Sequence, residues 1–322
     1  MTKVMTVAGP VDVEDLGITY MHEHIFLVSP EVQHYWPGAQ GWNEEVMVAR
    51  AREALTVLHR DYGVQTILDP TVPGLGRNIR AVRAAAEGTG LNVIAATGWY
   101  TYRDLPFALF AFDPTEKSTT LERLFLRDIE YGLEGTDVRP GVIKCAIDQY
   151  GLTPDIEVTL RAAARAHVAS GLPITTHTDP SIRGGLIQQD IFADEGVDLE
   201  AVVIGHCNWS ADLSYLEQLI DNGSYIGFDR CGMAGPEVDL AAQLDNLVEL
   251  CARGYATRIV LSHDQGVYVP MIPDWILDMI PDGRYGYLHS SLLPALRRRG
   301  VGEAEIQSML VENPRAYFSR SA

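Results

Sequence analysis

The sequence predicts an α/β protein, a (β/α)8 or TIM barrel forming a single domain over residues 1–322 with a short N-terminal β-hairpin. Short apolar runs rich in β-branched residues alternate with longer helical patterns along the whole chain. Most of these runs are continuously apolar, as parallel strands covered on both faces are. No Gly/Ser linker, low-complexity tract or block of like charge divides the 322 residues, and a barrel of this length is commonly one domain.

The order of the elements follows from these runs. A hairpin at about 4–15 comes first. The expected strands are Gly17–Phe26, Val64–Asp69, Leu91–Thr97, Gly141–Ile147, Leu172–Thr178, Ala201–His206, Ser224–Asp229 and Arg258–Asp264. The expected helices lie near 43–61, 77–87, 119–134, 155–170, 183–195, 211–221 and 239–253, with a last pair near 290–299 and 302–318.

Signals at the helix starts support this order. Thr119-x-x-Glu122 is a capping-box pattern, and Thr153-Pro154 places a capping hydroxyl before a first-turn proline. A doubly wound open sheet is the alternative architecture. It fits the sequence less well, because no G-x-G-x-x-G motif follows the first strand.

Composition narrows the class of partner. The chain has 25 Lys and Arg against 43 Asp and Glu, a net charge of −18. This charge argues against a nucleic-acid partner, because binding a polyanion requires basic patches. It also disfavours a strongly anionic substrate, unless bound metals reverse the local field.

The sequence also carries information about location. The four cysteines form no C-x-x-C pair, which favours a reduced compartment. The first residues lack the charged and apolar regions of a signal peptide. No apolar run approaches the roughly 18 residues of a membrane-spanning helix. We therefore expect a cytoplasmic protein without a membrane partner.

The first expected strand carries Met21-His22-Glu23-His24. In an extended strand, residues two apart point to the same face, so His22 and His24 project together and Glu23 faces the other way. Two imidazoles at the C-terminal end of a strand form half of a site for a divalent transition metal. Taken alone, the pair is equally compatible with a polar strand that binds no metal.

The chemistry of such a barrel lies at the C-terminal ends of its strands. These ends carry His22 and His24, Asp69, Thr97 and Tyr100, Lys144, His177, His206, Asp229 and Arg230, and Asp264. Singly, His177 or His206 is compatible with a hydrogen-bonded core histidine, and Asp264 with a turn cap. Four histidines, a lysine and an aspartate at one end of a barrel together predict a metal site.

The remaining five histidines are expected outside that site. His34 and His289 fall in loops, His59 and His167 on helices, and His263 on the strand face opposite its neighbouring ligand. We expect them at the surface or behind the ligands.

Lys144 is the unusual member of the set. An ammonium beside two dications is repelled, and a buried lysine prefers its neutral amine. A neutral amine can add carbon dioxide, giving a carbamate whose two oxygens bridge two metals as a carboxylate does. The alternative is a lysine paired with an acid at the barrel rim.

The motifs resemble those of the phosphotriesterase family of the amidohydrolase superfamily, and more narrowly its phosphotriesterase-like lactonases. The resemblance covers the chain from Gly9-Pro10 and Asp15-Leu16-Gly17 through His22-Glu23-His24 to Glu312-Asn313-Pro314. Its other motifs are Thr97-Gly98-Trp99-Tyr100, Ile143-Lys144-Cys145-Ala146, Thr176-His177-Thr178, Ile204-Gly205-His206-Cys207, Gly227-Phe228-Asp229-Arg230 and Leu261-Ser262-His263-Asp264. The loop segments Gln265–Tyr268 and Cys231–Met233 depart from several relatives.

The resemblance implies a binuclear centre. His22, His24 and Asp264 would hold a buried metal, and His177 and His206 an exposed one. Lys144, carbamylated to N6-carboxylysine, and a hydroxide would bridge the two. Zinc is the expected metal, with cobalt, iron or manganese as alternatives. Three residues are expected to be catalytic: Asp264 as proton acceptor, and Tyr100 and Arg230 facing a bound lactone.

These expectations define a metal-dependent lactonase that hydrolyses N-acyl homoserine lactones and related lactones, an activity that quenches quorum sensing. Side activity on phosphotriesters and esters is expected, because a carbonyl and a phosphoryl oxygen make similar demands on the centre. Primary phosphotriesterase activity is the alternative. A non-catalytic metal site fits less well, because structural zinc sites are usually closed and rich in cysteine.

Two further expectations concern the last loop and the assembly. The apolar residues of 265–280 form a lid or channel for an acyl chain, or a short helix at Asp274–Ile280 that packs on the barrel. For Arg230, an ion pair with Asp229 is the alternative to a role toward substrate. A homodimer is the expected assembly, because it is the commonest oligomer.

Overall fold

A computed structural model describes residues 2–109, 117–270 and 285–320. In these residues eight parallel strands form one sheet, in the order β3, β5, β6, β7, β8, β9, β10, β11. The strands are β3 (Thr19–Tyr20), β5 (Thr66–Asp69), β6 (Asn92–Gly98), β7 (Val142–Ile147), β8 (Ile174–Thr178), β9 (Val202–Ile204), β10 (Tyr225–Phe228) and β11 (Ile259–Leu261). The Met21 amide donates to the Leu261 carbonyl at 3.3 Å, bringing the two edges together. The predicted (β/α)8 barrel is confirmed.

The first strand differs from the continuous run expected over Gly17–Phe26. It is broken into β3 and β4 (His24–Phe26), and β4 pairs with β12 (Gly266–Tyr268) rather than with a barrel neighbour. The His24 amide donates to the Gln265 carbonyl at 2.7 Å. The chain therefore leaves the barrel wall between the two histidines and joins the segment that follows Asp264.

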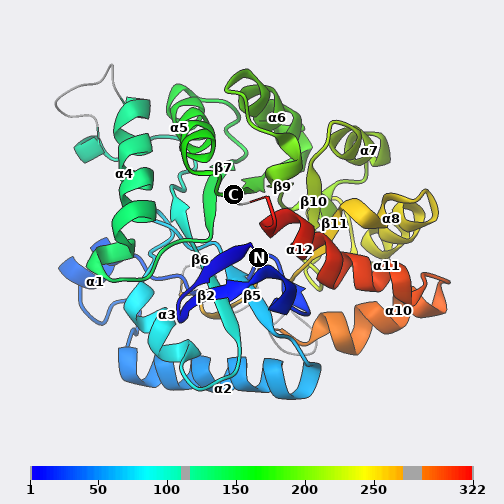
Figure 1. Cartoon of the computed structure of the whole chain (residues 1–322), viewed down its shortest axis with the longest axis horizontal. Coiled ribbons are helices and arrows are strands. Elements are labelled where there is room, and N and C mark those ends of the chain that lie inside the picture. The colour runs from blue at the N-terminus through cyan, green and yellow to red at the C-terminus, as the bar shows by residue number, and fades with distance from the viewer. Residues whose placement is uncertain (1, 110–116, 271–284, 321–322) are drawn as a thin grey trace.

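The helices surround the sheet (Figure 1). They are α1 (Pro30–Tyr35), α2 (Glu44–Tyr62), α3 (Ile79–Ala86), α4 (Lys117–Tyr131), α5 (Pro154–Ser170), α6 (Gly184–Asp194), α7 (Leu213–Asp221), α8 (Leu240–Ala252), α10 (Leu293–Arg298), α11 (Glu303–Gln307) and α12 (Asn313–Phe318). Thr153 caps α5 as predicted, its side chain accepting from the Ile156 amide at 3.3 Å. The expected cap at Thr119 is wrong, because α4 already begins at Lys117.

Two of the expected histidine positions are also corrected. His34 lies in α1, which we did not expect, rather than in a loop. Ser29 caps this helix and Pro30 begins it, a start signal that the sequence contains. His289 lies in a single π-helical turn, Leu288–Leu292, that leads into α10. His59 and His167 lie on α2 and α5 as expected.

The N-terminal end of the barrel is closed. The predicted hairpin is confirmed as β1 (Lys3–Thr6) and β2 (Gly9–Asp12). Figure 1 shows it crossing the centre of the molecule beside α12. Val4 from the hairpin and Tyr317 and Phe318 from α12 pack in one buried cluster with interior side chains of the strands. This closure leaves the C-terminal ends of the strands as the open end.

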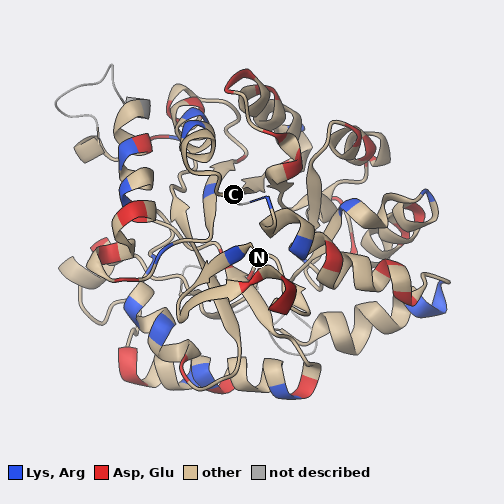
Figure 2. Cartoon of the chain, viewed as in Figure 1, with Lys and Arg blue, Asp and Glu red and all other residues tan. Residues whose placement is uncertain are grey.

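Charged residues are spread over the outside of the molecule. Figure 2 shows acidic residues on outer helices all round the barrel, mixed with fewer basic ones. Within the described residues, no helix combines the length and the apolar character needed to cross a membrane.

Candidate metal centre

A cavity of about 940 Å³ opens at the C-terminal ends of the strands. All the residues that we predicted as ligands or catalytic groups line it: His22, His24, Tyr100, Lys144, His177, His206, Arg230 and Asp264. They come from seven strand ends far apart in the sequence. The barrel topology therefore brings together what the sequence separates.

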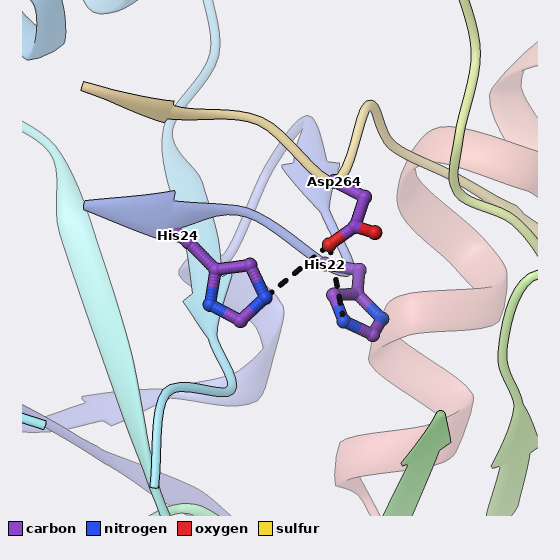
Figure 3. Close-up of side chains that lie close together, drawn as sticks. All are labelled: His22, His24 and Asp264. Atoms are coloured by element: carbon purple, nitrogen blue, oxygen red, sulfur yellow. Dashed lines mark ion pairs between the residues drawn. The ribbon is translucent and has the colours of Figure 1, made fainter. Parts of the chain in front are cut away.

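His22, His24 and Asp264 form the first cluster (Figure 3). Asp264 Oδ1 lies 3.2 Å from His24 Nε2 and 3.6 Å from His22 Nε2. Both histidine side chains are buried, and each could offer one ligand atom to a common ion. The break in the first strand has not separated them, since Figure 3 shows both imidazoles on the side of the Asp264 carboxylate.

The other predicted ligands lie against this cluster. Lys144 Nζ is 3.1 Å from His22 Nε2. His206 Nε2 is 2.9 Å from His177 Nδ1 and 3.8 Å from Asp264 Oδ2. Lys144 is therefore only 1% exposed and lies directly against one of the predicted ligands, His22.

The outer nitrogen of each imidazole has a hydrogen-bond partner. Asp229 lies behind two of them, with its oxygens 3.1 Å from His22 Nδ1 and 2.9 Å from His206 Nδ1. His24 Nδ1 is 2.7 Å from Thr71 Oγ1, which in turn donates to Asp69 at 2.5 Å. Such partners fix the tautomer and direction of a metal-binding histidine.

The remaining imidazole is held by a different carboxylate. His177 Nε2 lies 2.7 Å from Asp148 Oδ2. The arrangement of inward nitrogens and outward partners is what a divalent transition metal requires of histidine ligands. The residues present therefore fit the metals that the sequence predicts.

Burial sets the protonation of the site. It lowers the pKa of His22 to about 4, and nearby Lys144 acts in the same direction. It also lowers the pKa of His206 well below its usual value, with Arg230 adding to the effect. Neutral imidazole is the form that binds a metal, so both histidines are ready ligands at neutral pH.

His24 and Asp264 show the opposite balance. Burial lowers the pKa of His24, but hydrogen bonds that its imidazole donates to the Asp264 and Asp69 carboxylates outweigh this effect and raise the pKa to about 9. Burial raises the pKa of Asp264, but the Arg230 guanidinium and the histidines hold it well below its usual range. The Asp264 carboxylate is thus ionised. A metal that binds His24 would displace the proton of its imidazole.

Two residues of the site have a strained backbone. His206 has φ 60° and Asp264 has φ 56°, both in the left-handed region that non-glycine residues rarely adopt. His206 lies two residues after the end of β9, and Asp264 lies three residues after the end of β11. Such strain concentrates at functional sites, where surrounding contacts hold it.

Arg230 and Tyr100 lie at the cavity wall. The Arg230 guanidinium stacks 4.0 Å from the centre of the Trp209 ring, and its Nε donates to Asp264 Oδ2 at 2.8 Å. Its carboxylate partner is therefore Asp264 and not Asp229, which we had considered. The Tyr100 hydroxyl donates to Asp148 at 3.2 Å and lies 3.5 Å from His177 Nε2.

Sequence reasoning missed four residues of the site: Thr71, Asp148, Asp229 as a histidine partner, and Trp209. Asp148 and Thr71 directly follow strands or nearly so, and the strand-end rule could have found them. Trp209 gives no such signal. The apolar wall expected from 265–280 is seen only at Val269, because residues 271–280 lie outside the described residues.

Comparison with known proteins defines the class. A model of the phosphotriesterase family matches residues 2–318. A phosphotriesterase homology protein of Mycobacterium tuberculosis (strain H37Rv) is 43% identical, over 99% of this chain and 98% of that one. An aryldialkylphosphatase of Saccharolobus solfataricus is 35% identical, over 96% of this chain and 97% of that one.

Structural comparison agrees. The solved structure of the phosphotriesterase from Mycobacterium tuberculosis matches with a TM-score of 0.93 and 42% identity, covering 99% of this chain and 98% of that one. Fold, His/Asp clusters and relatives together define a metal-dependent hydrolase built on an α/β barrel. The chain belongs to the phosphotriesterase family.

Proposed function

We propose that the protein is a lactonase that hydrolyses N-acyl homoserine lactones and related lactones, and so quenches quorum sensing. The observation that carries the proposal is the placement of Arg230. Its guanidinium is fixed between the Trp209 ring and Asp264, on the wall of the same cavity as the His/Asp cluster. A guanidinium fixed at this point can donate its N–H groups to the carbonyl or amide oxygen of an acyl lactone.

The proposed centre holds two divalent metals. His22, His24 and Asp264 would bind one, and His177 and His206 the other, with Lys144 as N6-carboxylysine between them. Zinc suits such a set of imidazoles and carboxylates, as do cobalt, iron and manganese. Two bound metals would supply a hydroxide near neutral pH and polarise the oxygen of the bond to be cleaved.

The protein's own residues complete the chemistry. Asp264, ionised in the cavity, accepts the proton of the attacking water and passes it to the leaving alkoxide. In a lactone the leaving group stays attached, so ring opening gives a hydroxy acid. Tyr100 and Arg230 orient the reacting groups. Apolar cavity residues offer room for an acyl chain: Leu27, Leu75, Tyr102, Met233 and Val269.

Primary phosphotriesterase activity is the second candidate. It is favoured by the 35% identical aryldialkylphosphatase. A neutral triester with a good leaving group needs neither an oriented guanidinium nor an acyl channel. We regard triester and aryl ester hydrolysis as side activities of the same centre.

Location and assembly belong to the same proposal. All four cysteines are buried free thiols, which suits the reducing cytoplasm. A homodimer follows from the general preference for two-fold assemblies. The partner in catalysis is a small lactone or ester.

Substrate preference tests this function. The measurement is kcat/KM of the wild-type protein on homoserine lactones of increasing acyl length, beside a triester with a good leaving group. We expect the lactones to be preferred by at least about tenfold, and kcat/KM to rise with chain length as apolar area is buried. A preference for the triester, or no dependence on acyl length, contradicts the proposal.

A further inference from the structure

Asp148 is a carboxylate that we did not predict as a ligand, and it touches both a predicted ligand, His177, and a predicted substrate-binding residue, Tyr100. It follows β7 directly, four residues after Lys144. Its Oδ2 lies 2.7 Å from His177 Nε2 and 3.2 Å from the Tyr100 hydroxyl. The side chain is 15% exposed and lines the cavity.

The carboxylate is itself held in place. Asp148 Oδ1 accepts from the Gln149 amide at 2.6 Å, and the Asp148 carbonyl accepts from the Gly151 amide at 2.7 Å. One oxygen thus anchors the loop and the other faces the site. That oxygen contacts Nε2 of His177, while His206 faces the other ring nitrogen, Nδ1, so Asp148 lies on the side of the imidazole away from His206.

This geometry decides which nitrogen His177 offers. Because Asp148 is an acceptor at Nε2, the proton of the neutral ring lies on that nitrogen. The lone pair is then on Nδ1, which faces His206 Nε2 at 2.9 Å inside the site. His206 has the opposite arrangement, since its Nδ1 donates to Asp229. The two imidazoles therefore offer different nitrogens to the same space.

The same geometry restricts Tyr100. Its single hydroxyl hydrogen is directed to Asp148, so only oxygen lone pairs remain for the cavity. Tyr100 can then accept a hydrogen bond from the attacking water but cannot donate one to the substrate carbonyl. Donation to the carbonyl falls to Arg230, whose guanidinium carries further N–H groups beyond the Nε used on Asp264.

We propose that Asp148 is a positioning residue that fixes His177 as a metal ligand through Nδ1 and Tyr100 as an acceptor for the attacking water. The inference rests on the proposed metal-dependent lactonase function. It assigns Tyr100 to the attacking water and leaves the lactone carbonyl to Arg230.

The first test measures zinc affinity by competition with a chelator, without any substrate. In Asp148→Ala, His177 loses its outer partner, so the weaker of two zinc sites should lose about 10- to 100-fold in affinity while the tighter one changes little. Asp148→Asn keeps one acceptor oxygen and should lose less. The matched control is Asp221→Asn, because Asp221 also accepts from a tyrosine hydroxyl, that of Tyr255, but at the surface.

The second test concerns Tyr100 and uses a double-mutant cycle on lactone turnover. Asp148→Asn and Tyr100→Phe should each lower kcat more than they raise KM. Their combined effect should be smaller than the product of the two, because both variants remove the same oriented hydroxyl. Thermal unfolding of each variant shows whether it is folded, and Asp148→Asn decides if Asp148→Ala is not.

The outcomes separate the inference from the function beneath it. If both Asp148 variants keep the wild-type zinc affinity and the wild-type kcat on the lactone, the proposed role of Asp148 is wrong. The lactonase proposal is unaffected by that result. Multiplicative losses in the cycle overturn the Tyr100 part. A wild-type protein that prefers triesters contradicts the lactonase, while a weakened second zinc site in Asp148→Ala still supports the positioning of His177.

Discussion

Lys144 is a lysine enclosed by histidines and carboxylates, and burial lowers its pKa to about 8 against the opposing pull of Asp264 and Asp229. As the pH rises through this value, the neutral amine becomes the main form. In the proposed centre this neutral amine would add carbon dioxide, so that an anion able to bridge two metals replaces a cation that they would repel. The structure therefore offers the reactive form of the side chain at a pH close to neutral.

Replacing this lysine should disable the centre. In Lys144→Ala both the bound zinc and the lactone turnover should be lost, because no bridge remains between the two groups of ligands. Added short carboxylates should partly restore both by occupying the vacated space. Lys3→Ala, on the hairpin at the closed end of the barrel, is the control. Metal analysis and turnover measure the effect, and a fully metallated, active Lys144→Ala would refute the carbamate.

At this scale the sequence predicts well the residues that face the cavity, and poorly the hydrogen-bond partners behind them. His22, His177 and Asp264 were found because each comes at the end of an apolar run, and the barrel brings such ends together. Asp148 and Thr71 act through a second nitrogen of a histidine, which no spacing reveals. The left-handed φ of His206 and Asp264 could not be predicted from the sequence either, because neither residue type indicates such a φ.

At the scale of elements, the break in the first strand organises the site. Glu23 is fully buried at this break and is bonded to the segment after β11. Its Oε1 accepts from Ser262 Oγ at 2.9 Å and from the His263 amide at 2.9 Å, and its Oε2 accepts from the Gln265 amide at 3.1 Å. These contacts flank Asp264 on both sides and hold its left-handed turn.

A single change at this break should weaken both fold and centre. In Glu23→Gln an amide NH₂ replaces one acceptor, so a buried N–H loses its partner. We expect the free energy of unfolding to fall by about 1–3 kcal/mol and zinc affinity to fall with it. Glu45→Gln, at an exposed position of the first turn of α2, should change stability by less than about 0.5 kcal/mol. Denaturant unfolding and chelator competition provide the measurements, and unchanged values for Glu23→Gln would show that Glu23 does not hold the turn.

Elements marked by a strong apolar pattern were predicted from the sequence. Strand pairings and helix starts that depend on particular contacts were not. The barrel strands and α5, with its Thr153 cap, follow from the sequence. The pairing of β4 with β12 depends on a segment some 240 residues away, as the Glu23 contacts also do. The start of α4 was misplaced, because Thr119 and Glu122 form a capping pattern inside a helix that had already begun.

The whole molecule has one closed end and one open end. The hairpin and α12 fill the N-terminal end of the barrel, and the cavity occupies the other. The net charge of −18 gives the surface a field that attracts cations and opposes anionic substrates. A neutral lactone and divalent metals suit this field better than a charged phosphate ester does.

The central claim is that lactone hydrolysis depends on two metals held by this cavity, and a metal titration tests it most directly. Metal-free protein is reconstituted with increasing zinc in the presence of bicarbonate, and kcat/KM on an N-acyl homoserine lactone is measured at each step. We predict negligible turnover without metal and a rise that ends at about two zinc ions per chain. Full turnover by the metal-free protein, or a plateau at one zinc ion per chain, would contradict the account.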